Sequence, residues 1–125
     1  MDNGNKVVAV LRDLMFQVKI QAAAKQAGLE PVFVESQEDA LARAKEKPAL
    51  IILDLNHSAA EPLETIAKLK NDQETRAVNL LCYVSHVQSD LKRAAQQSGC
   101  DVVLARSALS QNLPAILARC VQKSP

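Results

Sequence analysis

Five short apolar segments alternate with five amphipathic segments along the chain of 125 residues, and this alternation constrains the fold more than any single motif does. The apolar segments are rich in valine, leucine and isoleucine and too short for helices, so they predict buried strands. Strands that are apolar throughout are typical of parallel sheets covered by helices on both faces. The sequence therefore predicts an α/β fold with a doubly wound five-stranded parallel sheet, formed by one domain over residues 1–125. The expected strands are residues 6–11, 31–36, 49–55, 78–85 and 101–106.

The amphipathic segments carry signals for helix ends as well as for helix faces. The first, residues 14–28, spaces apolar side chains at helical intervals and stops at Gly28, a residue that commonly closes a helix. Its expected buried face consists of Met15, Val18, Ala22 and Ala23. Ser36 is placed to cap the second helix, and Pro62 fits the first turn of the third. Because a proline inside a helix costs about 3 kcal/mol, the fifth helix is expected to begin near Pro114.

Charge and composition exclude several classes of protein. With 15 Lys and Arg against 14 Asp and Glu, the chain has no overall attraction for nucleic acid or for an anionic membrane. One Tyr, two Phe and no Trp leave few rings on which bases could stack. No apolar run approaches the roughly 18 residues that a membrane span requires, and the expected location is the cytoplasm. Three widely spaced cysteines fit reduced, buried thiols better than a zinc site: Cys82, Cys100 and Cys120.

Polar and charged residues follow the expected strands, at the edge where doubly wound sheets bind ligands. Asp54 ends the third strand after a continuous apolar run, either as a reactive group displayed at the sheet edge or as a turn acid. His57 and His86 follow the third and fourth strands, but two histidines without a third ligand make a weak metal site. The residues expected at this edge are Leu11, Arg12, Asp13, Asp54, Leu55, Asn56, Ser85, His86, Arg106 and Ser107.

Three segments together resemble the receiver domains of two-component response regulators, and the resemblance covers essentially the whole chain. LIILDLN (residues 50–56) is similar to their phosphoacceptor strand, residues 63–85 to their third helix and fourth strand, and AAQQSGCDVVLARS (residues 94–107) to their fourth helix and fifth strand. The resemblance implies a flavodoxin-like sheet with strand order 2-1-3-4-5. It also implies that Asp54 is the phosphoacceptor, that Ser85 is the hydroxyl residue of the switch, and that Arg106 replaces the family's lysine.

The chain departs from the receiver pattern where that pattern supplies metal ligands. Counted back from Gly28, the family's pair of acids falls on Leu11 and Arg12, and neither residue offers a carboxylate. Magnesium prefers hard oxygen ligands, so metal binding and efficient phosphorylation are expected to be lost. An alternative Mg²⁺ site, which requires a one-residue shift at the strand end, consists of Asp13, Asp54 and Asn56.

Substitutions near the switch also depart from the receiver pattern. The family's aromatic switch residue falls on Val103 and its usual proline on Ser107. Arg106 keeps the charge of the lysine in a planar fork, which suits a static pair with a carboxylate better than a small phosphoryl group. We therefore expect Arg12 or Arg106, or both, to pair with Asp54 and to lower its pKa.

These features predict a non-catalytic pseudo-receiver, a signalling module that is no enzyme, needs no cofactor and binds a protein independently of phosphorylation. The expected partner is a histidine kinase, an output protein or a second copy of the chain. The face that receivers most often use comprises Gln88 to Gln97, Asp101 to Arg106 and Leu113 to Lys123. Two alternatives remain open. One is a working phosphoacceptor, phosphorylated at Asp54 by a histidine kinase with Mg²⁺; the other is a sensor in which Arg12 and Arg106 hold a small anionic ligand.

Overall fold

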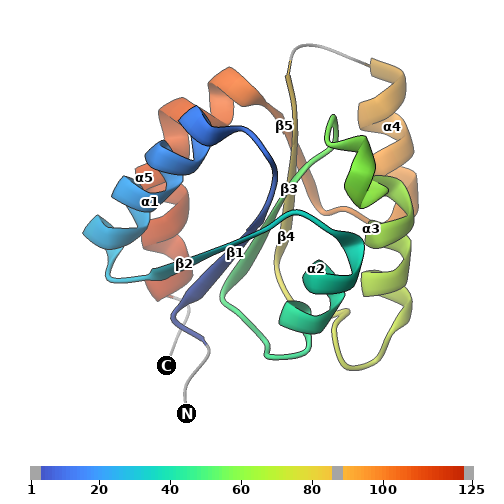
Figure 1. Cartoon of the computed structure of the whole chain (residues 1–125), viewed down its shortest axis with the longest axis horizontal. Helices are drawn as coiled ribbons and strands as arrows, with labels where there is room; N and C mark the ends of the chain where they lie inside the picture. Colours follow the sequence, from blue (N-terminus) through green and yellow to red (C-terminus); the bar gives the residue numbers. More distant parts are fainter. Residues whose placement is uncertain (1–3, 86–88, 123–125) are drawn as a thin grey trace.

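The computed structural model describes residues 4–85 and 89–122 and confirms the predicted α/β architecture. Its five strands are all parallel and form one sheet in the order β2-β1-β3-β4-β5 (Figure 1). The strands are β1 (Lys6–Val10), β2 (Glu30–Val34), β3 (Leu50–Asp54), β4 (Leu80–Val84) and β5 (Val102–Ala105). The strand order reverses between β1 and β3, so ligands are expected at the carboxyl ends of these two strands.

Helices cover both faces of the sheet (Figure 1). Helices α1 and α5 pack on one face over an apolar cluster that includes Phe16 and Leu113, and α2, α3 and α4 pack on the other, where Ile66 is buried. None of these helices is both long enough and apolar enough to cross a bilayer, within the part of the chain that the structure describes. The helices are α1 (Leu14–Ala27), α2 (Gln37–Ala44), α3 (Pro62–Asn71), α4 (Ser89–Ser98) and α5 (Arg106–Gln122), with a short 3-10 helix at Ser58–Ala60.

The predicted helix-end signals are confirmed for three helices. Gly28 ends α1 in the left-handed conformation, with φ of 78°. The Ser36 hydroxyl accepts a 3.0 Å hydrogen bond from the Asp39 backbone N–H and caps α2. Pro62 is the first residue of α3, where its missing N–H costs no helical hydrogen bond.

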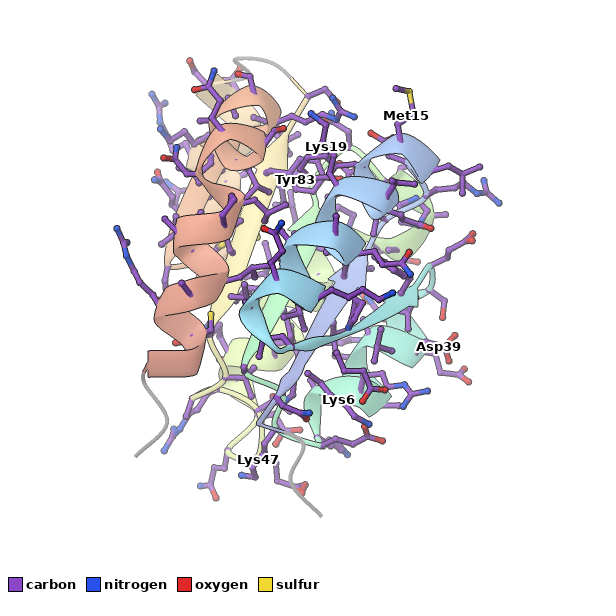
Figure 2. All side chains as sticks on the ribbon, turned by 90° about the vertical axis from the view of Figure 1, so that its left-hand side faces the viewer. Lys6, Met15, Lys19, Asp39, Lys47 and Tyr83 are labelled. Atoms are coloured by element: carbon purple, nitrogen blue, oxygen red, sulfur yellow. The ribbon has the colours of Figure 1, made fainter. Side chains whose placement is uncertain are left out.

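Helix α1 buries a different face from the one that its apolar spacing predicted. The buried residues are Phe16, Ile20, Ala23 and Ala24. In contrast, the side chains of Met15 and Val18 are 77% and 66% exposed, and Figure 2 shows Met15 pointing away from the molecule. The prediction that Met15, Val18 and Ala22 are buried is therefore wrong, because the bulkier Phe16 and Ile20 take the positions against the sheet and α5, whereas the prediction for Ala23 is confirmed. The exposed side of the helix, called the α1 stripe below, consists of Leu14, Met15, Val18 and Ala22.

Helix α5 begins at Arg106, directly after β5, so the prediction that it begins near Pro114 is wrong. Pro114 lies inside the helix and removes one backbone hydrogen bond, at a cost of roughly 3 kcal/mol. Leucines on both sides of the proline are buried, and each contributes about 1.5–3 kcal/mol by leaving water. Their combined burial outweighs the cost of the proline and keeps the helix continuous. These residues are Leu109, Leu113 and Leu117.

Candidate functional site

The carboxyl ends of four strands bring a small set of polar side chains to one edge of the sheet. Asp54 is the last residue of β3, and Tyr83 lies beside it in the register of β4. Because side chains alternate along a strand, Asp54 and Tyr83 both face α1 and α5. Asp13 follows β1 as the N-cap of α1, and Arg106 follows β5 as the first residue of α5.

Asp13 and Arg106 form an ion pair that joins the starts of α1 and α5. The Asp13 Oδ2 atom accepts hydrogen bonds from Arg106 Nη2 at 2.7 Å and from Nε at 2.9 Å. The other carboxylate oxygen, Oδ1, accepts a 3.1 Å bond from the Phe16 backbone N–H and so caps α1. Burial alone would raise the pKa of Asp13, but these bonds and the guanidinium charge outweigh it and hold the pKa below its usual value.

Two aromatic rings support this ion pair from the core side. The guanidinium carbon of Arg106 lies 4.8 Å from the centre of the Phe16 ring, a cation–π geometry. The Phe16 ring in turn packs on Tyr83, with centroids 4.9 Å apart and planes inclined at 52°. Figure 2 looks onto α1 and α5, with Tyr83 behind them. Phe16 therefore serves the site twice, because its N–H binds Asp13 and its ring lies under Arg106.

Asp54 is half-buried, and no arginine pairs with it among the ion pairs of residues 4–85 and 89–122. Its Oδ1 atom accepts a 2.8 Å hydrogen bond from the Asn56 backbone N–H. Burial raises the pKa of Asp54 above its usual value, although the Asn56 bond and the nearby His57 partly offset this effect. The Tyr83 hydroxyl is buried beside it and has no hydrogen-bond partner in acceptable geometry among the described residues. Burial and the charge of Asp54 raise the pKa of Tyr83.

The expectation that Arg12 or Arg106 pairs with Asp54 is wrong, and so is the expected fall in the pKa of Asp54. Arg106 pairs with Asp13, while Arg12 turns toward β2, where its Nε atom lies 3.2 Å from Glu35 Oε1. The Arg12 and Glu35 side chains are 74% and 58% exposed, so their ion pair contributes little to stability. Sequence reasoning missed Glu35, which follows the strand next to β1 and could have been found by including that strand end.

The other predicted site residues that the structure describes lie around this edge, and most of them contact the backbone of neighbouring strands or loops. The Ser85 N–H donates a 2.7 Å hydrogen bond to Asn56 Oδ1, which ties the ends of β3 and β4 together. His57 is nearly buried, and its Nε2 atom lies 2.7 Å from the Glu35 carbonyl oxygen, a distance at which Nε2–H donates. Val103 is buried beneath α4, and Ser107 is exposed. His86 lies outside the described residues.

Several solved structures with this arrangement of strands and helices are response regulators or receiver domains. A response regulator from Hahella chejuensis superposes with a TM-score of 0.84 over 97% of this chain and 98% of its own, at 17% sequence identity. The receiver domain of a sensor histidine kinase from Pseudomonas aeruginosa, with a magnesium ion coordinated in its active-site cleft, gives 0.80 over 96% and 99%, at 17% identity. The chain has the fold of a response-regulator receiver domain.

A third solved structure with the receiver fold, a chemotaxis response regulator of Vibrio cholerae, gives a TM-score of 0.78 at 20% identity over 92% of this chain and 97% of its own. No protein-family model matches the chain, and no curated protein matches it either. At these identities the likeness establishes the fold, including the predicted strand order 2-1-3-4-5.

The residues at the edge do not fit the magnesium ion that the receiver fold implies. Leu11 is fully buried and apolar, and Arg12 points to Glu35. Both carboxylate oxygens of Asp13 are already engaged, one by the Phe16 N–H and the other by Arg106. Among the described residues, no three His, Cys, Asp or Glu side chains are grouped so that they could hold a metal ion. The alternative site at Asp13, Asp54 and Asn56 would therefore require Arg106 to release Asp13.

Replacing Asp54 by asparagine should stabilise the fold at neutral pH. The raised pKa means that burying the charged carboxylate opposes folding. Asparagine removes the charge, while its side-chain oxygen can still accept the bond from the Asn56 N–H. We expect the free energy of unfolding to rise by about 0.5–2 kcal/mol, measured by urea denaturation near neutral pH.

The pH dependence of the Asp54→Asn effect provides its control. A carboxyl group whose folded pKa is raised opposes folding above that pKa, and the cost disappears as the pH falls toward the unfolded value, 3.8. The advantage of the variant should therefore shrink as the pH is lowered to about 4. A variant no more stable than the wild type at neutral pH would show that burial does not penalise the charge of Asp54.

Proposed function

We propose that the chain is a receiver-fold signalling module that binds another protein and has lost phosphotransfer. The observation that carries this proposal is the pairing of Asp13. Its two oxygens are occupied by the Phe16 N–H and by Arg106, and the two positions before it are Leu11 and Arg12. Phosphorylation of an aspartate places several negative charges in one small site, and a divalent cation normally compensates them. Among the described residues of this edge, no side chain replaces the cation for Asp54.

The position of Arg106 also argues against a phosphoryl group on Asp54. In the receiver pattern a lysine at this place reaches the phosphoryl oxygens as a compact charge. Here the guanidinium is held by the Asp13 carboxylate on one side and by the Phe16 ring on another. A planar guanidinium held in this way is not free to move onto a phosphoryl group each time one is added to Asp54.

Two exposed surfaces support the proposal of a protein partner. The predicted face lies on α4, β5 and α5, where β5 is one of the two edge strands and Val102 is 43% exposed. The outermost residues of this face, Gln88 and Lys123, lie outside the described residues. The second surface is the α1 stripe, which exposes large apolar side chains beside the candidate site. Contiguous exposed apolar side chains commonly mark interaction surfaces. A histidine kinase, an output protein or a second copy of the chain remains the expected kind of partner, and the cytoplasm the expected location.

Both alternatives lose support from the arginine contacts. A working phosphoacceptor with Asp13 as a metal ligand needs the Asp13 to Arg106 bonds of 2.7 and 2.9 Å to break first. A sensor for a small anion needs free guanidinium groups, yet Arg12 pairs with Glu35 and Arg106 with Asp13. In both cases the ligand would have to displace a carboxylate that is already in contact.

The purified chain should not accept a phosphoryl group from acetyl phosphate in the presence of millimolar magnesium. The reason is that Leu11 and Arg12 offer no carboxylate, and Asp13 is already engaged, to hold a charge-compensating cation beside Asp54. Intact-mass spectrometry after incubation should show only the unmodified chain, and amide NMR should show no saturable magnesium-induced shifts at Asp13, Asp54 and Asn56.

The Asp54→Asn variant serves as the matched control. It removes the phosphoacceptor carboxylate while leaving an oxygen for the Asn56 N–H. A phosphoryl adduct on the wild-type chain that is absent from this variant would overturn the proposal and establish a working phosphoacceptor. An adduct on both proteins would place the modification elsewhere.

A further inference from the structure

The two most buried cysteines of the chain lie in direct contact. The sulfur atoms of Cys82 and Cys100 are 2.8 Å apart, and the two side chains are 0% and 5% exposed. Two nonbonded heavy atoms normally settle at about 3.5–4 Å, whereas a disulfide bond measures about 2.05 Å. The pair is therefore closer than two thiols ordinarily approach, and a shift of about 0.8 Å would bring the sulfurs to bonding distance.

The backbone around each of the two cysteines determines how closely their sulfur atoms approach. Cys82 lies in the middle of β4, on the face covered by α3 and α4. Cys100 comes just before β5, where its backbone N–H donates a 3.0 Å bond to the carbonyl of Ala95 at the end of α4. Its sulfur lies 3.9 Å from the Leu80 carbonyl oxygen, next to the strand that carries Cys82. The two side chains thus face each other across neighbouring parts of the sheet.

A lysine holds the loop that carries Cys100. Lys70 of α3 is largely buried, and its Nζ atom lies 3.1 Å from Asp101 Oδ2. The same ammonium group donates to the carbonyl oxygens of Arg76 and Val78. Gly99, with φ of 116°, makes the turn between α4 and this loop directly over the Lys70 side chain. Since the loop is tied down on both sides of Cys100, the sulfur position follows from the fold.

The third cysteine is placed differently. Cys120 lies on α5, on the opposite face of the sheet, where it packs at the margin of the cluster that contains Leu113 and Leu117. A sheet therefore separates its thiol from the other two. Cys120 is half-buried, and it provides an internal reference for the reactivity of a thiol on the opposite face of the sheet from Cys82 and Cys100.

We propose that Cys82 and Cys100 form a redox-active dithiol that takes up a single disulfide bond when the chain meets a low-molecular-weight disulfide such as glutathione disulfide. The Cys100 thiolate attacks glutathione disulfide, forms a mixed disulfide and releases one glutathione thiolate. The Cys82 thiolate then attacks the Cys100 sulfur and releases the second. Two electrons pass from the cysteine pair to the glutathione disulfide, which becomes two molecules of glutathione, and the two cysteine protons pass to the released thiolates.

The order of attack follows from exposure. Cys100 is the more accessible thiol and lies nearer the edge strand β5, whereas Cys82 is fully enclosed in the core. The contact between the two thiols lowers the pKa of Cys100 and, together with burial, raises the pKa of Cys82. A thiolate is the attacking species in disulfide exchange, so Cys100 reacts first and Cys82 resolves the mixed disulfide.

The disulfide bond would make the face formed by α4, β5 and α5 more rigid. It would join the middle of β4 to Cys100, two residues before β5, and so fix the loop between α4 and β5. This consequence rests on the proposed function, since only a partner that binds this face would sense it. Formation of the bond requires the two thiols and glutathione disulfide but no protein partner, so the experiment below can fail or succeed independently of the proposed function.

The test equilibrates the reduced full-length chain with excess glutathione disulfide and then blocks free thiols under denaturing conditions. We expect a product that has lost two hydrogen atoms between its cysteines, with the peptides of Cys82 and Cys100 linked in the digest. Urea denaturation should give a higher midpoint for this product than for the same sample after reduction. The Cys120→Ser variant should behave identically.

Single substitutions distinguish the outcomes. In Cys82→Ser, Cys100 has no resolving thiol and should stop at the mixed disulfide with glutathione, which is detected by its mass. If Cys82 and Cys100 of the wild-type chain are instead both recovered as blocked thiols, while Cys120 carries glutathione, the proposal is overturned. A link between Cys120 and either other cysteine would also overturn it, because it would require a thiol to cross the sheet.

Discussion

Replacing Phe16 by alanine should lower the free energy of unfolding by about 3–5 kcal/mol. Phe16 is fully buried, packs on Tyr83 and lies under the guanidinium of Arg106. Alanine would leave a cavity between α1 and the sheet and would remove both ring contacts. The backbone N–H that caps onto Asp13 is unaffected by the substitution, so the loss would report on the ring alone. Urea denaturation near neutral pH measures the change.

Met15→Ala is the matched control, because Met15 precedes Phe16 in the same helix and is 77% exposed. We expect this variant to differ from the wild type by no more than about 0.5 kcal/mol. The two substitutions together test which side of α1 is buried. If Met15→Ala costs as much as Phe16→Ala, the orientation of α1 described above is wrong, and the apolar spacing that predicted a buried Met15 is right.

Replacing Asp13 by alanine should cost about 1–3 kcal/mol. Losing an N-cap costs about 0.5–2 kcal/mol. The ion pair with Arg106 adds about 0.2–1 kcal/mol, a modest amount because both side chains are about one-third exposed and solvent screens them. Without Asp13 the Arg106 guanidinium would retain only its contact with the Phe16 ring among the interactions described above. The measurement is again the urea midpoint near neutral pH, with Arg106→Ala completing a double-mutant cycle.

Asp13→Asn separates the two contributions of this side chain. Asparagine is a good N-cap, so this variant should lose only the contribution of the charge, about 0.2–1 kcal/mol. The folded pKa of Asp13 is lowered, so its charge stabilises the fold at neutral pH and the benefit is lost as the pH falls below 3.8 through the folded value. The difference between wild type and Asp13→Asn should therefore vanish in acid. A difference that persists there would mean that the charge is not its source.

The fold could be predicted because its strands are apolar on both faces and its helices are marked at their ends. Continuous runs such as residues 49–53 fit the interior of a parallel sheet, and the structure places β3 there at the centre of the sheet. Gly28 and Ser36 supply local signals that do not depend on the rest of the chain. Pro114 misled the prediction because a local cost was outweighed by leucines that are buried only once the helix is docked.

The candidate site could be predicted as a set of residues but not as a set of contacts. Strand ends identify which side chains reach the edge, and Asp13, Asp54 and Arg106 are all found there. Their pairing depends on the direction of each side chain, which the sequence does not state. Asp13 turns back to cap α1, and this turn brings it to Arg106 rather than leaving Arg106 for Asp54. The spacing of residues along the sequence does not predict that the Phe16 ring lies under the Arg106 guanidinium.

Helix α1 is apolar on two opposite sides, the buried side with Phe16 and Ile20 and the α1 stripe. Rotating the helix by roughly half a turn about its axis would therefore lose less hydrophobic burial than it would in a helix that is apolar on one side only. Polar contacts at defined positions work against the rotated alternative: the bond between Asp13 and Arg106, and the 2.9 Å bond from Lys19 Nζ to Ser110 Oγ on α5. Both would be broken by the rotation. The charged pair thus favours the observed rotational state of α1 beside the burial of Phe16, so a ligand able to separate Asp13 from Arg106 would remove one of the contacts that hold the helix in this orientation.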